Sequence, residues 1–219
     1  MKKLQHFLRT TQGKFIAGLV IALAVLMAYY FYAVSRGDVN SVKEVVISET
    51  DHVRGAASGT VTLVEFGDFQ CPACAAYEPL VRKVVEENPE TVKFVFRHFP
   101  LTQIHPNALL AAKASEAAGL QGKFWEMHDM LYDNQQAWSG GLNAREIIIG
   151  YAKTLKLDEA KFSNDLNAAA VEEKILAEYQ EGSKLGVQGT PTFFINGKKI
   201  SNPQSFEAFD ALIKEAAKQ

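Results

Sequence analysis

The two cysteines of this chain stand two residues apart, in the segment Cys71-Pro-Ala-Cys74. They follow Thr60–Phe66, a run of β-branched and apolar residues that is typical of a strand buried on both faces. After them, apolar side chains recur at helical spacing as far as Val85. The sequence therefore predicts that a buried strand ends just before the cysteine pair and that the pair opens a helix.

A cysteine at the start of a helix is well placed to carry a negative charge. The first N–H groups of a helix have no partners within it, and the helix dipole stabilises an anion there. The pKa of Cys71 is therefore expected to fall from about 8.5 into the range of roughly 3.5 to 7.5. Pro72 suits the first turn because that position needs no N–H. Cys74 can close a disulfide with Cys71, and a stabilised thiolate makes that disulfide oxidising.

Two other uses of the cysteine pair find less support. A zinc site needs further ligands, but the chain has no second cysteine pair, and its histidines lack the paired spacing of zinc motifs. A structural disulfide across two residues would stabilise little, because it constrains few unfolded conformations. We therefore expect redox chemistry with no metal and no separate cofactor. With no further cysteine in the chain, electrons would pass directly to another molecule through a mixed disulfide.

The N-terminal region contains a twenty-residue uncharged stretch, residues 15–34. At about 1.5 Å per residue, a helix of this length spans roughly 30 Å, the thickness of a bilayer core. Residues 1–36 carry five basic and no acidic side chains, so the positive-inside rule keeps the N-terminus in the cytoplasm and the body outside. We predict an uncleaved signal-anchor. The alternative is a signal peptide cut after Ser35.

The charge distribution and the expected compartment limit the function further. The net charge is −2, and since residues 1–36 are basic, the rest of the chain is acidic. Nucleic-acid binders present a basic face, so no nucleic-acid partner is expected. Outside the cytoplasm thiols tend to be oxidised, which suits a catalytic cysteine pair.

The first half of the exported body predicts a βαβ unit followed by helices. Val42–Ile47 is a short strand candidate, and Val92–Phe96 is the strand that follows the cysteine helix. A right-handed crossover joins the two strands of such a unit. From Pro106 to Leu185 helical patterns follow one another, with a break near Asn167 and no strand candidate.

Strand character returns near the C-terminus. Thr192–Ile195 and Lys198–Ile200 flank Asn196-Gly197, a strong signal for a type I′ hairpin. Asn202, followed by proline, is expected to cap a final helix. The order βαβ, helices, ββα predicts one α/β domain with an inserted helical block.

The predicted segments are a cytoplasmic N-terminus (1–14), a transmembrane anchor (15–34), a tether (35–58), the first half of the α/β domain (59–103), the inserted helical domain (104–185) and the second half of the α/β domain (186–219).

Four segments together resemble the membrane-tethered, DsbA-like branch of the thioredoxin superfamily: LVEFGDFQCPAC, VKFVFRHFPL, GKFWEMHDMLY and LGVQGTPTFFING. The resemblance covers residues 51–217. It implies a thioredoxin fold with an inserted all-helical domain, in agreement with the order of elements. It also implies a single-pass protein of the bacterial cytoplasmic membrane, with its catalytic domain in the periplasm or at the cell surface.

The resemblance implies roles for residues around the cysteines. In such folds a cis-proline loop lies against the cysteine pair, and Thr190-Pro191 occupies the matching position before a strand. Thr190 and Pro191, with Pro72 and Ala73, would then contact an extended substrate chain, which can pair like an added strand. The sequence departs from the best-known member at Ala73, where a histidine would further stabilise the thiolate. A milder oxidant is therefore expected.

Glu65 is an acid inside the apolar strand. Burial should raise the pKa of its carboxyl and mark it as a functional candidate. The resemblance matches it to the family's buried acid, which suggests that it relays the proton of Cys74. The alternative is an acid satisfied structurally by a hydrogen bond.

The sequence thus predicts a thiol–disulfide oxidoreductase that introduces disulfides into reduced or unfolded exported proteins, with Cys71 as the exposed nucleophile. A quinone-linked membrane redox protein would reoxidise it. Two alternatives stay open. One is a reductase or isomerase of the same compartment, for example in cytochrome c maturation. The other is a chaperone-like binding module that needs no redox chemistry.

Overall fold

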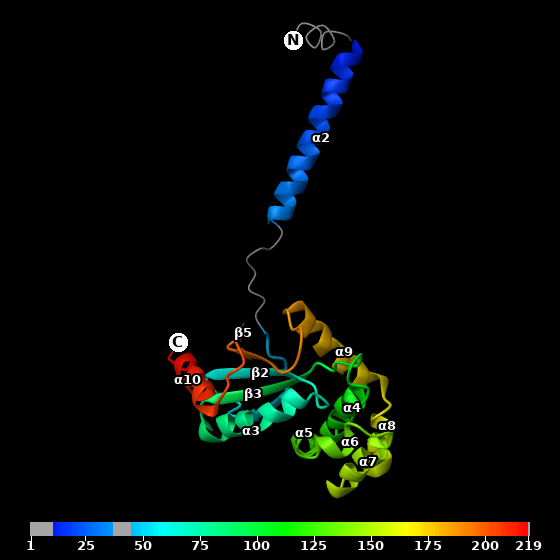
Figure 1. The fold of residues 1–219 in the computed structure, drawn as a ribbon, viewed down its shortest axis with the longest axis vertical. Coiled ribbons are helices and arrows are strands. Elements are labelled where there is room, and N and C mark those ends of the chain that lie inside the picture. Colours follow the sequence, from blue (N-terminus) through cyan, green and yellow to red (C-terminus); the bar gives the residue numbers. More distant parts are fainter. Residues whose placement is uncertain (1–10, 37–44, 219) are drawn as a thin grey trace. The chain divides into compact units, whose positions relative to one another are not determined.

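The computed structural model describes residues 11–36 and 45–218 (Figure 1). The chain divides into two compact units, Met1–Val42 and Lys43–Gln219. Residues 1–10 of the predicted cytoplasmic N-terminus and residues 37–44 of the predicted tether lie outside the described residues.

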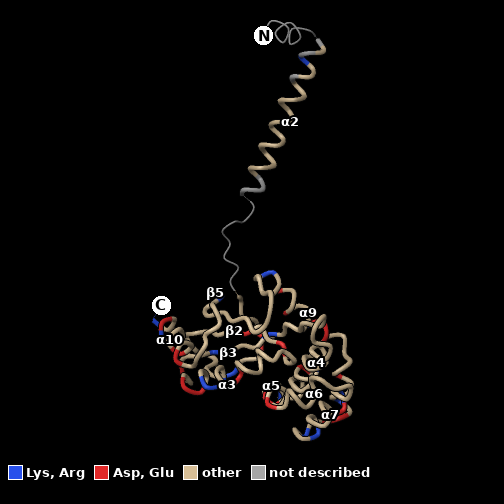
Figure 2. The backbone as a smooth tube through the Cα atoms, in the orientation of Figure 1, with Lys and Arg blue, Asp and Glu red and all other residues tan. Residues whose placement is uncertain are grey.

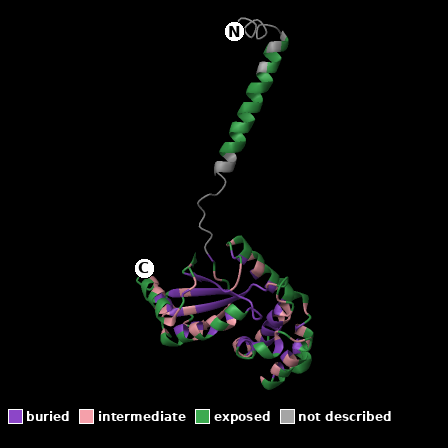
Figure 3. Cartoon of the chain, in the orientation of Figure 1, coloured by how far each residue is buried: buried purple, intermediate pink, exposed green. Residues whose placement is uncertain are grey.

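The described part of the first unit is one helix, α2 (Thr11–Arg36). Figure 2 shows a basic residue near its start and then an uncharged length of helix. Within it, Lys14–Tyr32 is long and apolar enough to cross a membrane, with a mean hydropathy of 2.2. None of this stretch is buried, and Figure 3 draws the described length of the helix as exposed.

The second unit is built on a mixed five-stranded sheet in the order β1-β3-β2-β4-β5. Only β2 and β3 run parallel, and the other neighbours are antiparallel. The central position of β2 explains its apolar sequence, since both of its faces are covered (Figure 3). The strands are β1 (His52–Gly55), β2 (Val61–Gly67), β3 (Val92–His98), β4 (Thr192–Ile195) and β5 (Lys198–Lys199).

Helices cover both faces of the sheet. On one face, α3 (Pro72–Glu87) and α10 (Phe206–Ala216) pack around Leu63. On the other, α9 (Ala169–Lys184) and the loop after it pack around Val64. Neighbouring residues of β2 point to opposite faces, which gives each layer its own core.

The secondary-structure elements between β3 and β4 are all helices, as predicted. It forms α4 (Ala108–Gly119), α5 (Phe124–Asp133), α6 (Gln135–Trp138), α7 (Ala144–Thr154), α8 (Glu159–Asp165) and α9. The break near Asn167 is confirmed between α8 and α9. The short α6 was not expected. The order βαβ, helices, ββα is therefore confirmed, with one strand added in front.

That added strand corrects the prediction for the segment before the domain. β1 pairs antiparallel with β3, so part of the expected tether (35–58) belongs to the sheet. The strand expected at Val42–Ile47 is wrong in its described part, because residues 45–47 have no strand structure. β1 was not predicted because His-Val-Arg-Gly has few apolar residues. A strand at the edge of a sheet does not require an apolar sequence.

The C-terminal hairpin and helix agree with expectation except at one residue. Asn196 and Gly197 both have positive φ, at 46° and 80°, as a type I′ turn requires. The final helix is capped by Ser205, whose hydroxyl accepts a hydrogen bond from the N–H of Ala208, and not by Asn202. Asn202 instead donates to the carbonyl of Pro191 at 2.9 Å.

A buried carboxylate joins the helical insert to the sheet. Oε1 of Glu116 on α4 lies 2.9 Å from Nε2 of His52 on β1 and 2.9 Å from Nε2 of His98 on β3. Nζ of Lys174 on α9 donates to the same oxygen at 2.5 Å. Burial raises the pKa of Glu116, but the two histidines and Lys174 outweigh it and hold the pKa well below its usual range. The insert is thus tied to two strands by hydrogen bonds as well as by packing.

Candidate active site

The cysteine pair lies where the sequence places it, at the junction of β2 and α3. Cys71 is the N-cap of α3, with φ −70° and ψ 121°, and proline takes the first helical position. Its carbonyl accepts the first helical hydrogen bond, from the N–H of Ala75 at 3.2 Å. Both cysteines are free thiols. Cys71 is 7% exposed and Cys74 is fully buried. Cys71 was predicted to be exposed. It is in fact buried, although it is more accessible than Cys74.

The two thiols have opposite electrostatic properties. A hydrogen bond from the Cys74 side chain is the main cause that lowers the pKa of Cys71, from 9.0 to about 5, against the effect of burial. The backbone N–H groups of Cys74 and Ala73 contribute in the same direction. Burial raises the pKa of Cys74 well above its usual value, and the hydrogen bond with Cys71 adds to this. The lowered pKa thus favours the thiolate of Cys71 at neutral pH, and the raised pKa favours the protonated thiol of Cys74.

The loop before β4 faces Cys71. The Thr190–Pro191 peptide bond is cis, which confirms the expected cis-proline. Sγ of Cys71 lies 3.4 Å from the carbonyl oxygen of Thr190 and donates to it when protonated. Of the other predicted substrate contacts, Pro72 and Ala73 are exposed beside Cys71, and Pro191 is buried. The structure thus brings Cys71, Thr190, Pro72 and Ala73 to one place.

Glu65 lies on β2 and is 3% exposed. Burial raises the pKa of its carboxyl well above 4.5, and the nearby charges of Glu78 and Cys71 add to the rise. Within residues 45–218 the structure gives this carboxyl no hydrogen bond. A Cβ at Gly67 would lie 2.4 Å from the Phe96 ring and 3.1 Å from Oε1 of Glu65. Glycine is therefore needed beside this acid.

Asp68 organises the turn before the cysteines, a role the sequence analysis missed. Its carboxylate accepts hydrogen bonds from the backbone N–H of Gln70 at 2.8 Å and of Leu101 at 2.9 Å. It also lies 2.7 Å from Nδ1 of His105. The N–H of Asp68 donates to Sγ of Cys74 at 3.5 Å. An acid in a turn is a recognisable signal for such bonds, but its partner loop is distant in sequence.

Two residues of the insert also reach the site. Tyr132 on α5 packs its ring against Phe69 at 4.9 Å, and its buried hydroxyl has no hydrogen-bond partner among the described residues. Burial raises the pKa of Tyr132, with Cys74 and Glu65 contributing. Gln135 on α6 contacts the backbone of the cysteine turn. Nothing in the local sequence distinguishes either residue from ordinary helix positions.

Glu78, His128 and Asp129 are the one group of described residues spaced like metal ligands. Their acids already have cationic partners. Arg54 donates to both oxygens of Asp129 at 2.8 Å, and Arg82 lies 3.1 Å from Glu78. The cluster is therefore an ion-pair network at the junction of sheet and insert, and we assign it no metal.

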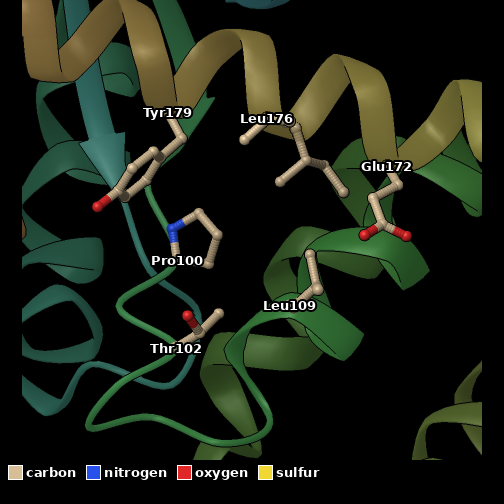
Figure 4. A pocket seen from close by; sticks show the side chains of 7 residues that line it. Pro100, Thr102, Leu109, Glu172, Leu176 and Tyr179 are labelled. Atoms are coloured by element: carbon tan, nitrogen blue, oxygen red, sulfur yellow. The ribbon is translucent and has the colours of Figure 1, made fainter.

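A cavity of about 260 Å³ opens beside α9 and the loop after β3 (Figure 4). It is lined by Pro100, Thr102, Leu109, Glu172, Ile175, Leu176 and Tyr179. None of these is a residue of the cysteine site. The candidate active site is therefore defined by Cys71 and its neighbours and not by this cavity.

Comparison with known proteins identifies the family. A sequence model of the family described as Thioredoxin matches residues 47–215. A Na⁺/H⁺ antiporter, NhaA 1 of Salinispora arenicola, is 43% identical over 171 residues, which are 77% of this chain and 25% of that protein. NhaA 3 of Salinispora tropica is 40% identical over 168 residues, with the same shares. The chain thus spans about a quarter of the length of the curated relatives it matches.

Solved structures show the same fold. A thioredoxin-like oxidoreductase from Silicibacter pomeroyi is 27% identical with a TM-score of 0.68, over 78% of this chain and 95% of that one. Oxidised BdbD from Bacillus subtilis is 25% identical with a TM-score of 0.67, over 77% and 94%. The α-DsbA1 of Wolbachia pipientis, at 19% identity, shares the fold with a TM-score of 0.70 over 80% and 94%. The chain therefore belongs to the thioredoxin family, as a DsbA-like member with an inserted helical domain.

Proposed function

We propose that this chain is a thiol–disulfide oxidoreductase that forms disulfide bonds in other exported proteins. The observation that carries the proposal is the asymmetry of the cysteine pair. The pKa of Cys71, the more accessible of the two, is lowered to about 5, and that of the fully buried Cys74 is raised. A stabilised Cys71 thiolate favours the reduced enzyme and so makes its disulfide a good acceptor of electrons.

The reaction starts from the Cys71–Cys74 disulfide. A substrate thiolate attacks Sγ of Cys71, a mixed disulfide forms, and Cys74 leaves and takes up a proton. A second substrate thiolate then attacks the substrate sulfur of the mixed disulfide and expels Cys71 as a thiolate. Two electrons have passed from the substrate to the enzyme. A membrane redox protein, quinone-linked in our proposal, removes them through a second mixed disulfide at Cys71.

Substrate binding follows from what surrounds Cys71. Pro72 and Ala73 are exposed, and the loop that carries Thr190 and Pro191 approaches the thiol. We assign the backbone of the partly exposed Thr190 to pairing with an extended substrate chain, a mode that tolerates many sequences because the backbone is what is recognised. Reduced, unfolded exported proteins fit this mode.

The direction of electron flow is tested by the equilibrium between the protein and a glutathione buffer. We expect a reduction potential nearer to about −120 mV than to about −270 mV, the values of a strong oxidant and of a reductant with this fold. The absence of a charged or imidazole side chain at Ala73 places the expected value between the extremes. A potential near the reducing limit would favour the reductase alternative and require an electron supply across the membrane.

The anchor is the second part of the proposal. The length of Lys14–Tyr32 and its exposed apolar surface support a single pass through the membrane, with the catalytic unit outside the cytoplasm. Removing residues 1–36 should move the protein from the membrane pellet to the soluble fraction, while the full chain resists an alkaline wash. A soluble mature protein that begins after Ser35 would show a cleaved signal peptide instead.

A further inference from the structure

The turn that carries Cys71 is held by the helical insert. The side-chain amide of Gln135, at the start of α6, donates hydrogen bonds to two carbonyls of this turn. Its Nε2 lies 2.7 Å from the carbonyl oxygen of Phe69 and 2.9 Å from that of Cys71. Gln135 is buried, so these bonds do not compete with bulk water.

A second set of bonds ties the residue between these two carbonyls to the same segment. Nε2 of Gln70 donates to the carbonyl of Ser139 at 2.7 Å, and its Oε1 accepts from the N–H of Asn107 at 2.6 Å. Nδ2 of Asn107 also donates to Ser139 at 3.2 Å. Residues 69–71 are thus all fastened to the segment 135–139.

The segment 135–139 is itself fixed. A helix as short as α6 has little stability of its own. Trp138 is fully buried in the core of the insert, and its Nε1 donates to the carbonyl of Leu131 at 2.8 Å. Gln135 is therefore held against the cysteine turn by the packing of the insert.

The bond to Cys71 has a consequence for its thiol. Because the Cys71 carbonyl is held by both Gln135 and the N–H of Ala75, rotation about ψ of Cys71 is restricted. The proline ring fixes the next φ. The hydrogen bonds to the Cys71 carbonyl and the ring of the following proline together fix the direction of the Cys71 side chain relative to the first N–H groups of α3.

We propose that Gln135 is a positioning residue, through which the helical insert sets the orientation of Cys71 at the start of α3 and so its oxidising strength. The proposal rests on the proposed function. It gives the insert a part in the chemistry, beyond covering the sheet. The electrons and protons of the reaction follow the route already described, and Gln135 exchanges neither.

The test compares Gln135→Met with Gln121→Met in the full, reduced chain in detergent. Met keeps the length of the side chain and suits a helix, but cannot donate. Gln121 is a partly exposed amide of the same insert, and its side-chain hydrogen bonds go to the backbone of Asp158 and not to the cysteine turn, so it serves as the matched control. The readout is the pH titration of the Cys71 thiolate by its ultraviolet absorbance.

For Gln135→Met we expect the pKa of Cys71 to rise by about half to one pKa unit, the equivalent of one lost hydrogen bond. We also expect a disulfide that is harder to reduce in a glutathione buffer. Gln121→Met should change neither. Gln135→Glu is a second variant, in case Gln135→Met fails to fold, because it keeps a polar side chain of the same size. Its ionised carboxylate cannot donate hydrogen bonds to the two carbonyls. It should raise the pKa at least as much.

An unchanged pKa in both Gln135 variants, even with a lowered melting temperature, would assign Gln135 a purely structural role and overturn the proposal. A wild-type chain with no thiolate at neutral pH would overturn the proposed function together with it. A normal wild-type titration with unshifted variants overturns this inference alone.

Discussion

Replacing Cys71 with Ser should abolish disulfide exchange completely, because no other accessible thiol can form the mixed disulfide. An ordinary thiol with a pKa of about 8.5 is only about 3% ionised at pH 7. With its pKa lowered to about 5, Cys71 is almost fully ionised there. Disulfide formation in a reduced test protein, followed by alkylation and mass measurement, should fall to the uncatalysed rate. Residual catalysis above that rate would contradict the assignment of Cys71 as nucleophile.

Cys74→Ser is the matched variant, and its expected result is different. Cys71 can still attack a disulfide, but the mixed disulfide has no neighbouring thiol to resolve it, so covalent complexes with partners should accumulate on non-reducing gels. Cys71→Ser should show none. A double Cys→Ser variant that kept its function in cells would favour the chaperone-like binding module over redox catalysis.

Much of this site could be predicted from sequence because its signals are local. A buried strand, a cysteine pair and a helical pattern follow one another between Thr60 and Val85, so the place of Cys71 at a helix start needs no long-range information. The hairpin at Asn196 is equally local, since two positive φ angles strongly favour Asn-Gly. The acid at Glu65 was recognisable because the apolar strand around it implies burial.

The residues that hold the site could not be predicted, because their partners are distant in the chain. Gln135 contacts a turn 64 and 66 residues earlier. Asp68 binds the loop after β3, and Asn202 binds the carbonyl of Pro191 instead of capping a helix. A polar side chain shows its partner only when the fold brings two segments together. β1 was missed for a related reason, since its pairing with β3, and not its composition, makes it a strand.

Replacing Glu65 with Gln should stabilise the oxidised protein at pH 7 but not at pH 4. Burial holds the folded-state pKa of Glu65 well above its ordinary 4.5, so between these pKa values the folded state binds more protons than the unfolded state. Stability therefore falls as pH rises through this window. The more burial raises the folded-state pKa of Glu65, the more stability is lost by pH 7. Gln does not titrate and escapes this cost.

The measurement is the difference in unfolding free energy between Glu65→Gln and wild type, by denaturant titration at both pH values. At pH 4 the difference in unfolding free energy reports only the effect of placing an amide in a buried site. The change in this difference from pH 4 to pH 7 therefore reports the protonation of Glu65 alone. The oxidised form is used because neither cysteine then titrates. A difference that does not vary with pH would mean that Glu65 ionises normally in the fold.

The same substitution should slow the step in which Cys74 gives up its proton. Cys74 must be deprotonated to attack a mixed disulfide, and burial raises its pKa well above the usual value. A carboxyl with a raised pKa can accept that proton near neutral pH, and an amide cannot. We expect resolution of the mixed disulfide to slow at least tenfold near pH 7, with the gap closing at high pH, where hydroxide replaces the base. Stabilisation without slower exchange would leave Glu65 a buried acid that costs stability and takes no part in the chemistry. Both effects together would show that the same buried carboxyl destabilises the fold and speeds the deprotonation of Cys74.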